Sequence, residues 1–216
     1  MGNATLILGE SGSGKSTSLR DLDNKTTVII NVLDKPLPFK GYKAKYNLES
    51  KNYLATDNAE MILRAIKKLN DERLDVKTLV IDDFQYILAN EYMRRASEVG
   101  YRKFTDIGSN AWKIVKALTE ARDDLDCFIL THNYVDVDGK SKIRTIGKML
   151  DDKVNLEGMF TVILHTMLVD NEYKFLTNSD GIHMAKSPMG MFTDKIIDNN
   201  LLNVKKTINN YNQEDN

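Results

Sequence analysis

Glycine, serine and lysine recur near the start of the chain in a pattern typical of a phosphate-binding loop. The run is Gly9-Glu10-Ser11-Gly12-Ser13-Gly14-Lys15-Ser16-Thr17. Glycines allow a tight turn whose backbone N–H groups converge on phosphate oxygens, and a helix N-terminus after the turn favours the same negative charge. At this spacing Lys15 is expected to reach the β- and γ-phosphates and Ser16 to bind Mg²⁺, while Thr17 faces the α-phosphate.

The segments on both sides of this run support the same interpretation. Residues 4–8 are a short apolar run typical of a buried strand, and residues 16–22 can begin a helix. A Gly/Ser-rich linker is the alternative, but a linker would not lie between a strand and a helix. The sequence therefore predicts a nucleotide-binding P-loop, the Walker A motif, at residues 9–17.

A second candidate site follows the apolar run at residues 79–81. Asp82, at the carboxyl end of that predicted strand, has the position of a Walker B aspartate, which holds the hydration shell of Mg²⁺. Asp83 stands where many ATPases carry a glutamate that polarises the attacking water, so it is a candidate catalytic base. It can equally cap the next helix, because the helix dipole favours acids there. The other candidate bases are Asp34, Glu10 and Gln85.

Thr131-His132-Asn133 closes the next apolar strand, which is expected over residues 126–131. In sheets of this type that strand lies between the P-loop strand and the strand that ends at Asp82. A polar side chain at its tip would face the γ-phosphate. His132 is therefore a candidate sensor that distinguishes triphosphate from diphosphate, and a histidine that only caps the strand end is the alternative.

Apolar runs alternate with amphipathic stretches along the rest of the chain, which predicts an α/β fold with a mostly parallel central sheet flanked by helices. Two apolar runs separated by Asp170-Asn171 predict an antiparallel hairpin near the C-terminus. Further strands are expected at residues 26–32 and 78–82, and helices at residues 58–70, 85–97, 106–123, 146–154 and 196–210, with a turn or hairpin at residues 135–140 and an N-cap at Thr56 or Asp57. We expect one domain over residues 1–210, followed by a polar tail at residues 211–216.

The composition is that of an ordinary globular protein, with 216 residues of which 42% are hydrophobic and 28% charged. Thirty basic and thirty-one acidic side chains give a net charge of −1, so a nucleic acid would have to bind a local patch. Cys127 lies in an apolar run and is expected in the core. No apolar stretch approaches a membrane span and no signal peptide precedes the first strand, so we expect an intracellular protein without a membrane partner.

The motifs resemble those of phage-encoded AAA-type or RecA-like P-loop ATPases, a group that includes the RecA-like single-strand annealing proteins (the fourth Sak-type group). The resemblance rests on residues 9–17, 79–85 and 131–132, and on Ala185-Lys186-Ser187-Pro188-Met189-Gly190-Met191-Phe192. It implies a RecA-like core that binds ATP and Mg²⁺ at a site between subunits of a homo-oligomeric ring or filament. It also implies work on single-stranded DNA in phage recombination or replication, such as annealing, beside other phage proteins in the cytoplasm of an infected bacterium.

Two further sets of candidate residues belong with this resemblance. Ring-forming ATPases stabilise the transition-state charge with an arginine or lysine from a neighbouring subunit, and Lys186 in its Gly/Pro-bounded loop suits that role unless it is simply a surface residue. RecA-like proteins place a DNA-contacting loop after the strand that ends here at His132. The basic residues of that loop are Lys140, Lys142, Arg144 and Lys148. A solvated hairpin is the alternative interpretation of that loop.

The segment at residues 39–53 is a second candidate for DNA, because it mixes lysines with aromatic rings as single-strand-binding surfaces do. A segment that only covers the sheet would look the same. The motifs also fit two other functions. A small-molecule or nucleotide kinase usually carries an arginine-rich lid, but the candidate lid at residues 137–148 contains only Arg144. A non-hydrolysing ATP switch, such as a helicase loader or assembly factor, would be consistent with aspartate instead of glutamate at position 83. The resemblance instead implies an ATPase that acts on DNA and is stimulated by it.

Overall fold

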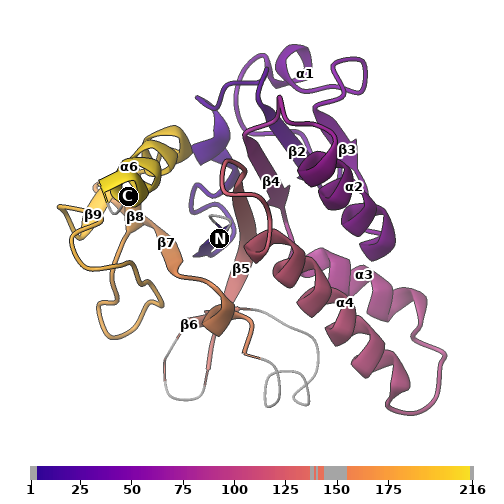
Figure 1. The fold of residues 1–216 in the computed structure, drawn as a ribbon. Helices are drawn as coiled ribbons and strands as arrows, with labels where there is room; N and C mark the ends of the chain where they lie inside the picture. Colours follow the sequence, from indigo (N-terminus) through magenta and orange to yellow (C-terminus); the bar gives the residue numbers. More distant parts are fainter. Residues whose placement is uncertain (1–3, 137–138, 140, 144–154, 215–216) are drawn as a thin grey trace.

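The computed structural model describes residues 4–136, 139, 141–143 and 155–214, and its centre is a single β-sheet (Figure 1). Its strands are β1 (Ala4–Gly9), β2 (Thr27–Asn31), β3 (Tyr53–Ala55), β4 (Thr78–Asp82), β5 (Asp126–Val135), β6 (Ser141–Ile143), β7 (Val162–Val169), β8 (Glu172–Leu176) and β9 (Ile196–Asp198). The order across the sheet is β3-β2-β4-β5-β1-β7-β8-β9, and β6 pairs with β5.

The directions of these strands confirm the predicted α/β architecture. Strands β3, β2, β4, β5, β1 and β7 run parallel, whereas β8 and β9 continue the sheet in antiparallel pairing. The predicted C-terminal hairpin is therefore present as β7 and β8. Strand β5 lies between β1 and β4, as expected from the sequence. It is longer than the strand expected at residues 126–131, because residues 133–135 pair with β6, so His132 lies within β5 and not at its end.

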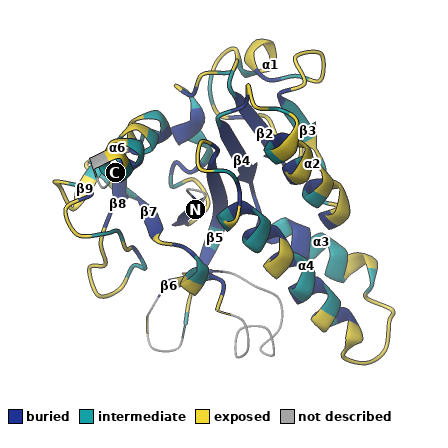
Figure 2. Cartoon of the chain, viewed as in Figure 1, coloured by how far each residue is buried: buried dark blue, intermediate teal, exposed yellow. Residues whose placement is uncertain are grey.

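Helices cover both faces of the sheet. One face packs against α2 (Ala59–Asp71), α3 (Gln85–Arg94) and α4 (Arg102–Thr119). The other face packs against the short 3₁₀ helix η1 (Ser16–Leu19), the segment around α1 (Tyr42–Lys45), and the closing helix α6 (Leu201–Glu214). A second 3₁₀ turn, η2 (Glu157–Met159), precedes β7. Figure 2 shows the central strands buried, whereas the edge strand β9 and the short helix α1 are largely exposed.

Strand β4 illustrates why the sequence forms this arrangement. Leu79 and Ile81 pack on the α2–α4 side, and Val80 between them packs on the η1 side. Because side chains alternate between the two faces of a strand, a sheet covered on both faces needs a continuous apolar run. Cys127 in β5 is buried in the same core, as expected.

Several predicted helices differ from the observed ones at their boundaries. Helix α3 ends at Arg94 and not at residue 97, and α4 covers Arg102–Thr119 and not residues 106–123. The helix expected at residues 16–22 is only the turn η1, because the Asp23 side chain accepts a hydrogen bond from the Lys25 N–H at 3.0 Å and forms a turn before β2. The helix expected at residues 196–210 starts at Leu201, because residues 196–198 pair with β8 as β9. It continues to Glu214, into the segment expected as a polar tail.

The predicted N-cap of α2 was wrong by one or two residues. Asn58, not Thr56 or Asp57, caps the helix, and its side chain accepts a hydrogen bond from the Met61 N–H at 3.0 Å. The Asp57 carboxylate instead pairs with Arg94 of α3 at 2.7 Å. Because its carboxylate is paired with Arg94, Asp57 does not cap α2.

The basic and aromatic segment at residues 39–53 covers the η1 side of the sheet. Tyr46 is buried and its hydroxyl donates to the Leu22 carbonyl, while Phe39, Tyr42 and Tyr53 pack against the same apolar cluster. Its rings are therefore engaged in the core. The helix expected at residues 146–154 lies outside the described residues. None of the helices in the described part of the chain is both long and apolar enough to span a membrane.

Candidate functional site

Four positions on different strands, three of them polar, share one face of the sheet near its carboxyl edge. They are Gly9 in β1, Asp82 in β4, His132 in β5 and Thr166 in β7. In each strand the residue two positions earlier packs into the apolar cluster on the η1 side. Because the side-chain period of a strand is two residues, all four positions point to that side.

The glycine-rich loop, residues 9–17, packs against β7 and β8 at two places that require glycine. The Thr166 hydroxyl lies 2.5 Å from the Ser13 hydroxyl, and a Cβ added to Gly9 would come within 1.8 Å of Thr166 Oγ1. Gly14 has a φ of 99°, and a Cβ there would lie 2.6 Å from Cγ of Tyr173. A side chain at either position would displace the loop from the sheet.

Several backbone N–H groups of this loop lack acceptors. Those of Gly12, Gly14, Lys15 and Ser16 donate no hydrogen bond to any described residue. Successive unpaired N–H groups in a tight turn form a concave site for an anion. The loop is therefore suited to bind phosphate oxygens.

Lys15 lies across this loop with its charge buried. Its Nζ donates to the carbonyl oxygens of Gly9 and Glu10, each at 2.7 Å. Burial lowers the pKa of Lys15 to about 8, although the carboxylates of Asp82 and Asp83 act in the opposite direction. An anion bound beside this side chain would stabilise its charged form.

Ser16 and Asp82 lie together, as the sequence predicts for a magnesium site. The Asp82 carboxyl is fully buried and burial raises its pKa to about 6, with a further increase from Asp83, while the Ser16 side chain lowers it. Asp82 Oδ1 has no hydrogen-bond partner among the described residues. A buried carboxylate oxygen without a partner beside a hydroxyl fits Mg²⁺, which prefers oxygen ligands and keeps several waters.

Asp83 lies next to Asp82 but has a different environment. Its backbone is left-handed, with a φ of 66°, and its Oδ2 lies 2.6 Å from Lys35 Nζ. His132 Nε2 lies 3.6 Å from Oδ1 of the same carboxylate. Burial alone would raise the pKa of Asp83, but His132 and Lys35 outweigh burial and hold it below its usual range. Asp83 is thus an ionised carboxylate between the side chains of Lys35 and His132.

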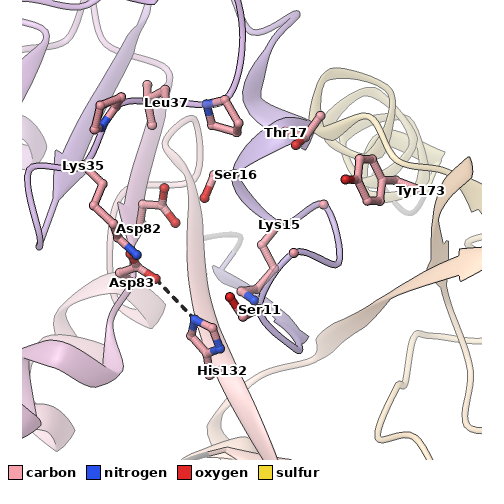
Figure 3. A pocket seen from close by; sticks show the side chains of 14 residues that line it. Ser11, Lys15, Ser16, Thr17, Lys35, Leu37, Asp82, Asp83, His132 and Tyr173 are labelled. Carbon is pink, nitrogen blue, oxygen red and sulfur yellow. Dashed lines mark ion pairs between the residues drawn. The ribbon is translucent and has the colours of Figure 1, made fainter.

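These groups line one cavity of about 250 Å³. It is lined by residues of the loop, the segment after β2, the ends of β4 and β5, and β8: Ser11, Gly12, Gly14, Lys15, Ser16, Thr17, Lys35, Pro36, Leu37, Pro38, Asp82, Asp83, His132 and Tyr173. Figure 3 shows Lys35 and the two aspartates on one side of the loop and Tyr173 on the other, beside Thr17. The structure therefore brings the two sequence motifs and His132 into one site.

The other candidate bases do not line this cavity. The Gln85 side chain is buried and accepts hydrogen bonds from the Thr131 hydroxyl at 2.9 Å and the His132 N–H at 3.1 Å, so it positions the end of β5. The Asp34 carboxylate accepts from the Tyr53 hydroxyl at 2.8 Å. The Glu10 side chain is exposed, and only its carbonyl oxygen contacts Lys15.

Two further predicted residues, Lys186 and Lys142, do not line the cavity of their own chain. Lys186 is exposed, and its backbone pairs with Ile163 at the start of β7. Of the candidate DNA-binding residues, Lys142 is exposed on β6 and pairs with Asp136 at 2.8 Å. Lys140, Arg144 and Lys148 lie outside the described residues.

Sequence reasoning missed Lys35 and Tyr173. A signal for Lys35 was present, because it follows a parallel strand whose last residue, Asn31, pairs with Asp82. Residues that follow neighbouring parallel strands meet at the same edge of the sheet. No comparable local signal marks Tyr173, because its position depends on the register of a hairpin far along the chain.

A scan of the chain against protein-family models finds no match, and a search of curated proteins finds none either.

Proposed function

We propose that this chain is a RecA-like P-loop ATPase, which binds ATP with Mg²⁺ in the cavity beside the glycine-rich loop and acts on single-stranded DNA. One observation carries the nucleotide part of this proposal. Unpaired N–H groups, a buried lysine and a buried carboxylate oxygen without a partner converge on one cavity. These are the donors and the metal ligand that a triphosphate with Mg²⁺ needs.

Each residue has a distinct part in this proposal. The loop N–H groups and Lys15 hold the β- and γ-phosphates, and Ser16 with Asp82 would hold Mg²⁺. The metal, when bound, neutralises charge that develops on the phosphate oxygens. Asp83 orients and deprotonates the attacking water, and His132, beside Asp83 in β5, contacts the terminal phosphate and reports its presence.

Strand β5 gives a physical route from the nucleotide to a DNA contact. Lys142 lies opposite Tyr134 in the β5–β6 pairing, and Tyr134 is two residues beyond His132. The three side chains therefore share one face of the strand pair. A change at His132 on loss of the terminal phosphate would shift β6 and with it Lys142, and the resemblance to RecA-like proteins supplies the single-stranded DNA as the partner of Lys142.

The resemblance also supports a site completed by a second subunit. Lys186 is exposed and lies outside the cavity of its own chain. In a ring or filament it would reach the terminal phosphate of a neighbouring subunit, as an arginine finger does. Hydrolysis would then rise with protein concentration.

A non-hydrolysing ATP switch is the second candidate, and the Lys35–Asp83 ion pair favours it. A carboxylate whose pKa is held below its usual range is a weak general base. While Lys35 pairs with Asp83, ATP can bind and turnover stays slow. In this alternative the bound triphosphate itself is the signal to a protein partner.

One experiment separates these functions. Phosphate release from Mg·ATP is measured with and without single-stranded DNA, while the molecular mass is measured with and without ATP. The proposal expects hydrolysis that DNA stimulates and assembly that ATP promotes, both lost in Lys15→Ala. Tight ATP binding without hydrolysis in either condition would identify the switch, and phosphate transfer to a nucleoside or nucleotide acceptor would identify a kinase.

A further inference from the structure

The β7–β8 hairpin extends past the end of β1 and over the glycine-rich loop. Strand β7 pairs with β1 up to His165, which lies opposite Leu8, and then continues to Val169. At the rise of a strand, this extension is about 13 Å long. The hairpin then reverses at Asp170 and Asn171, which have φ values of 50° and 63°. Two left-handed residues in succession form the tight turn that fixes a hairpin's register.

This register places Tyr173 on the loop. Tyr173 lies opposite Leu168 and so shares its face of the hairpin, which is also the face of Thr166. Thr166 contacts the start of the loop at Gly9 and Ser13, and Tyr173 contacts Gly14. Tyr173 nevertheless keeps 41% of its surface exposed and lines the cavity. Part of the ring is therefore available to a ligand.

The cavity has two chemically different ends. Lys35, Asp82 and Asp83 form a charged end, where the metal and the terminal phosphate belong. Thr17 and Tyr173 form the opposite end, as Figure 3 shows. Because Thr17 is the loop residue that faces the α-phosphate, the nucleoside leaves the loop on this side.

We propose that Tyr173 stacks on the base of the bound nucleotide and so makes the site selective for a nucleoside triphosphate over a bare polyphosphate chain. This inference rests on the proposed nucleotide function. An aromatic ring stacks on the face of any purine and does not distinguish groups on the base edge. The subsite therefore accepts adenine and guanine alike.

The test compares two ligands and four proteins. Dissociation constants for Mg·ATP and for magnesium tripolyphosphate are measured with the unaltered chain, Tyr173→Ala, Tyr173→Phe and Leu168→Ala. Leu168 is the matched control, because it is exposed on the same hairpin face opposite Tyr173 and does not line the cavity. Thermal unfolding of each variant without ligand shows whether the fold is intact.

We expect Tyr173→Ala to weaken ATP binding by about ten-fold, as for loss of one base–aromatic stack, and to leave tripolyphosphate binding unchanged. Tyr173→Phe and Leu168→Ala should retain the affinity for both ligands, and GTP should bind within a few-fold of ATP. Equal loss of both ligands in Tyr173→Ala would overturn the subsite and show that the ring only supports the loop. Unchanged ATP affinity would also overturn it. If the unaltered chain binds neither ligand, the proposed function fails and the subsite fails with it.

Discussion

The ammonium nitrogen of Lys35 lies 2.6 Å from a carboxylate oxygen of Asp83, at the charged end of the cavity. Asp83 is the residue that the sequence marks as a candidate base, and it is buried with a left-handed backbone. Such a conformation in a non-glycine residue costs free energy and is concentrated at functional sites. The ion pair therefore controls how basic Asp83 is.

Removing the Lys35 charge should move the acid limb of the pH–rate profile. Without the ammonium group the pKa of Asp83 rises, because burial raises this pKa and only His132 is then left to lower it. As the pH is lowered, the hydrolysis rate of Lys35→Met should therefore begin to decline at a higher pH than that of the unaltered chain. The profile of Lys35→Arg should match that of the unaltered chain. Steady-state hydrolysis across the acid range checks this, and identical acid limbs in Lys35→Met and Lys35→Arg would refute it.

Asp82→Asn should stabilise the ligand-free protein while removing Mg²⁺-dependent binding. The folded-state pKa of Asp82 is raised to about 6, so the unaltered protein gains stability as the pH falls through about 6 and loses it as the pH rises. A neutral amide avoids this cost, which is up to about 3 kcal/mol at neutral pH. Urea unfolding at pH 7 without nucleotide measures the change, with the exposed Glu49→Gln as the control. A destabilised Asp82→Asn would contradict the burial cost assigned to the carboxylate.

The affinity for Mg·ATP should fall as the pH rises past about 8. Lys15 has a pKa of about 8 in the ligand-free protein, and only its charged form attracts phosphate. Since one proton is involved, the loss approaches about ten-fold per pH unit above that value. Titrations from pH 7 to 9.5 at constant ionic strength test this. A constant affinity in the unaltered chain would exclude Lys15 as the titrating group.

Gly9→Ala should destabilise the protein and weaken nucleotide binding, chiefly through its contact with β7, although the added methyl group would also lie 2.6 Å from Ser13 Oγ. The added methyl group would lie 1.8 Å from Thr166 Oγ1, so either the loop or the strand must move. Overpacking of this kind costs about 1–3 kcal/mol. Thr166→Ala in the same chain removes that atom and should recover part of the stability. A double-mutant cycle measures the recovery, and strictly additive effects would show that the two residues do not clash.

Alternation along single strands made much of the site predictable from sequence. Asp82 ends β4 and His132 directly follows the buried run of β5, and both point to the η1 side because Val80 and Leu130 do. The placement of β5 between β1 and β4 was likewise predicted and is confirmed. These features depend on local pattern and on the general geometry of parallel sheets.

The remaining features depend on contacts between distant segments. Lys35 joins the site through the pairing of β2 with β4, and Tyr173 joins it through the turn and register of the β7–β8 hairpin. The helix after the loop is shortened by the Asp23 turn, which a pattern of apolar residues does not reveal. The positions of Lys35 and Tyr173 therefore depend on strand pairing between distant segments, and the length of the helix after the loop depends on a side-chain hydrogen bond of Asp23.

The most direct test of the central claim is calorimetric titration of Mg·ATP into the unaltered chain and into Lys15→Ala. We predict saturable binding of one nucleotide per chain, lost in Lys15→Ala although that variant unfolds as cooperatively as the unaltered protein. Equal Mg·ATP affinity in the two proteins, or no binding to the unaltered chain, would contradict the assignment of residues 9–17 as a nucleotide-binding loop.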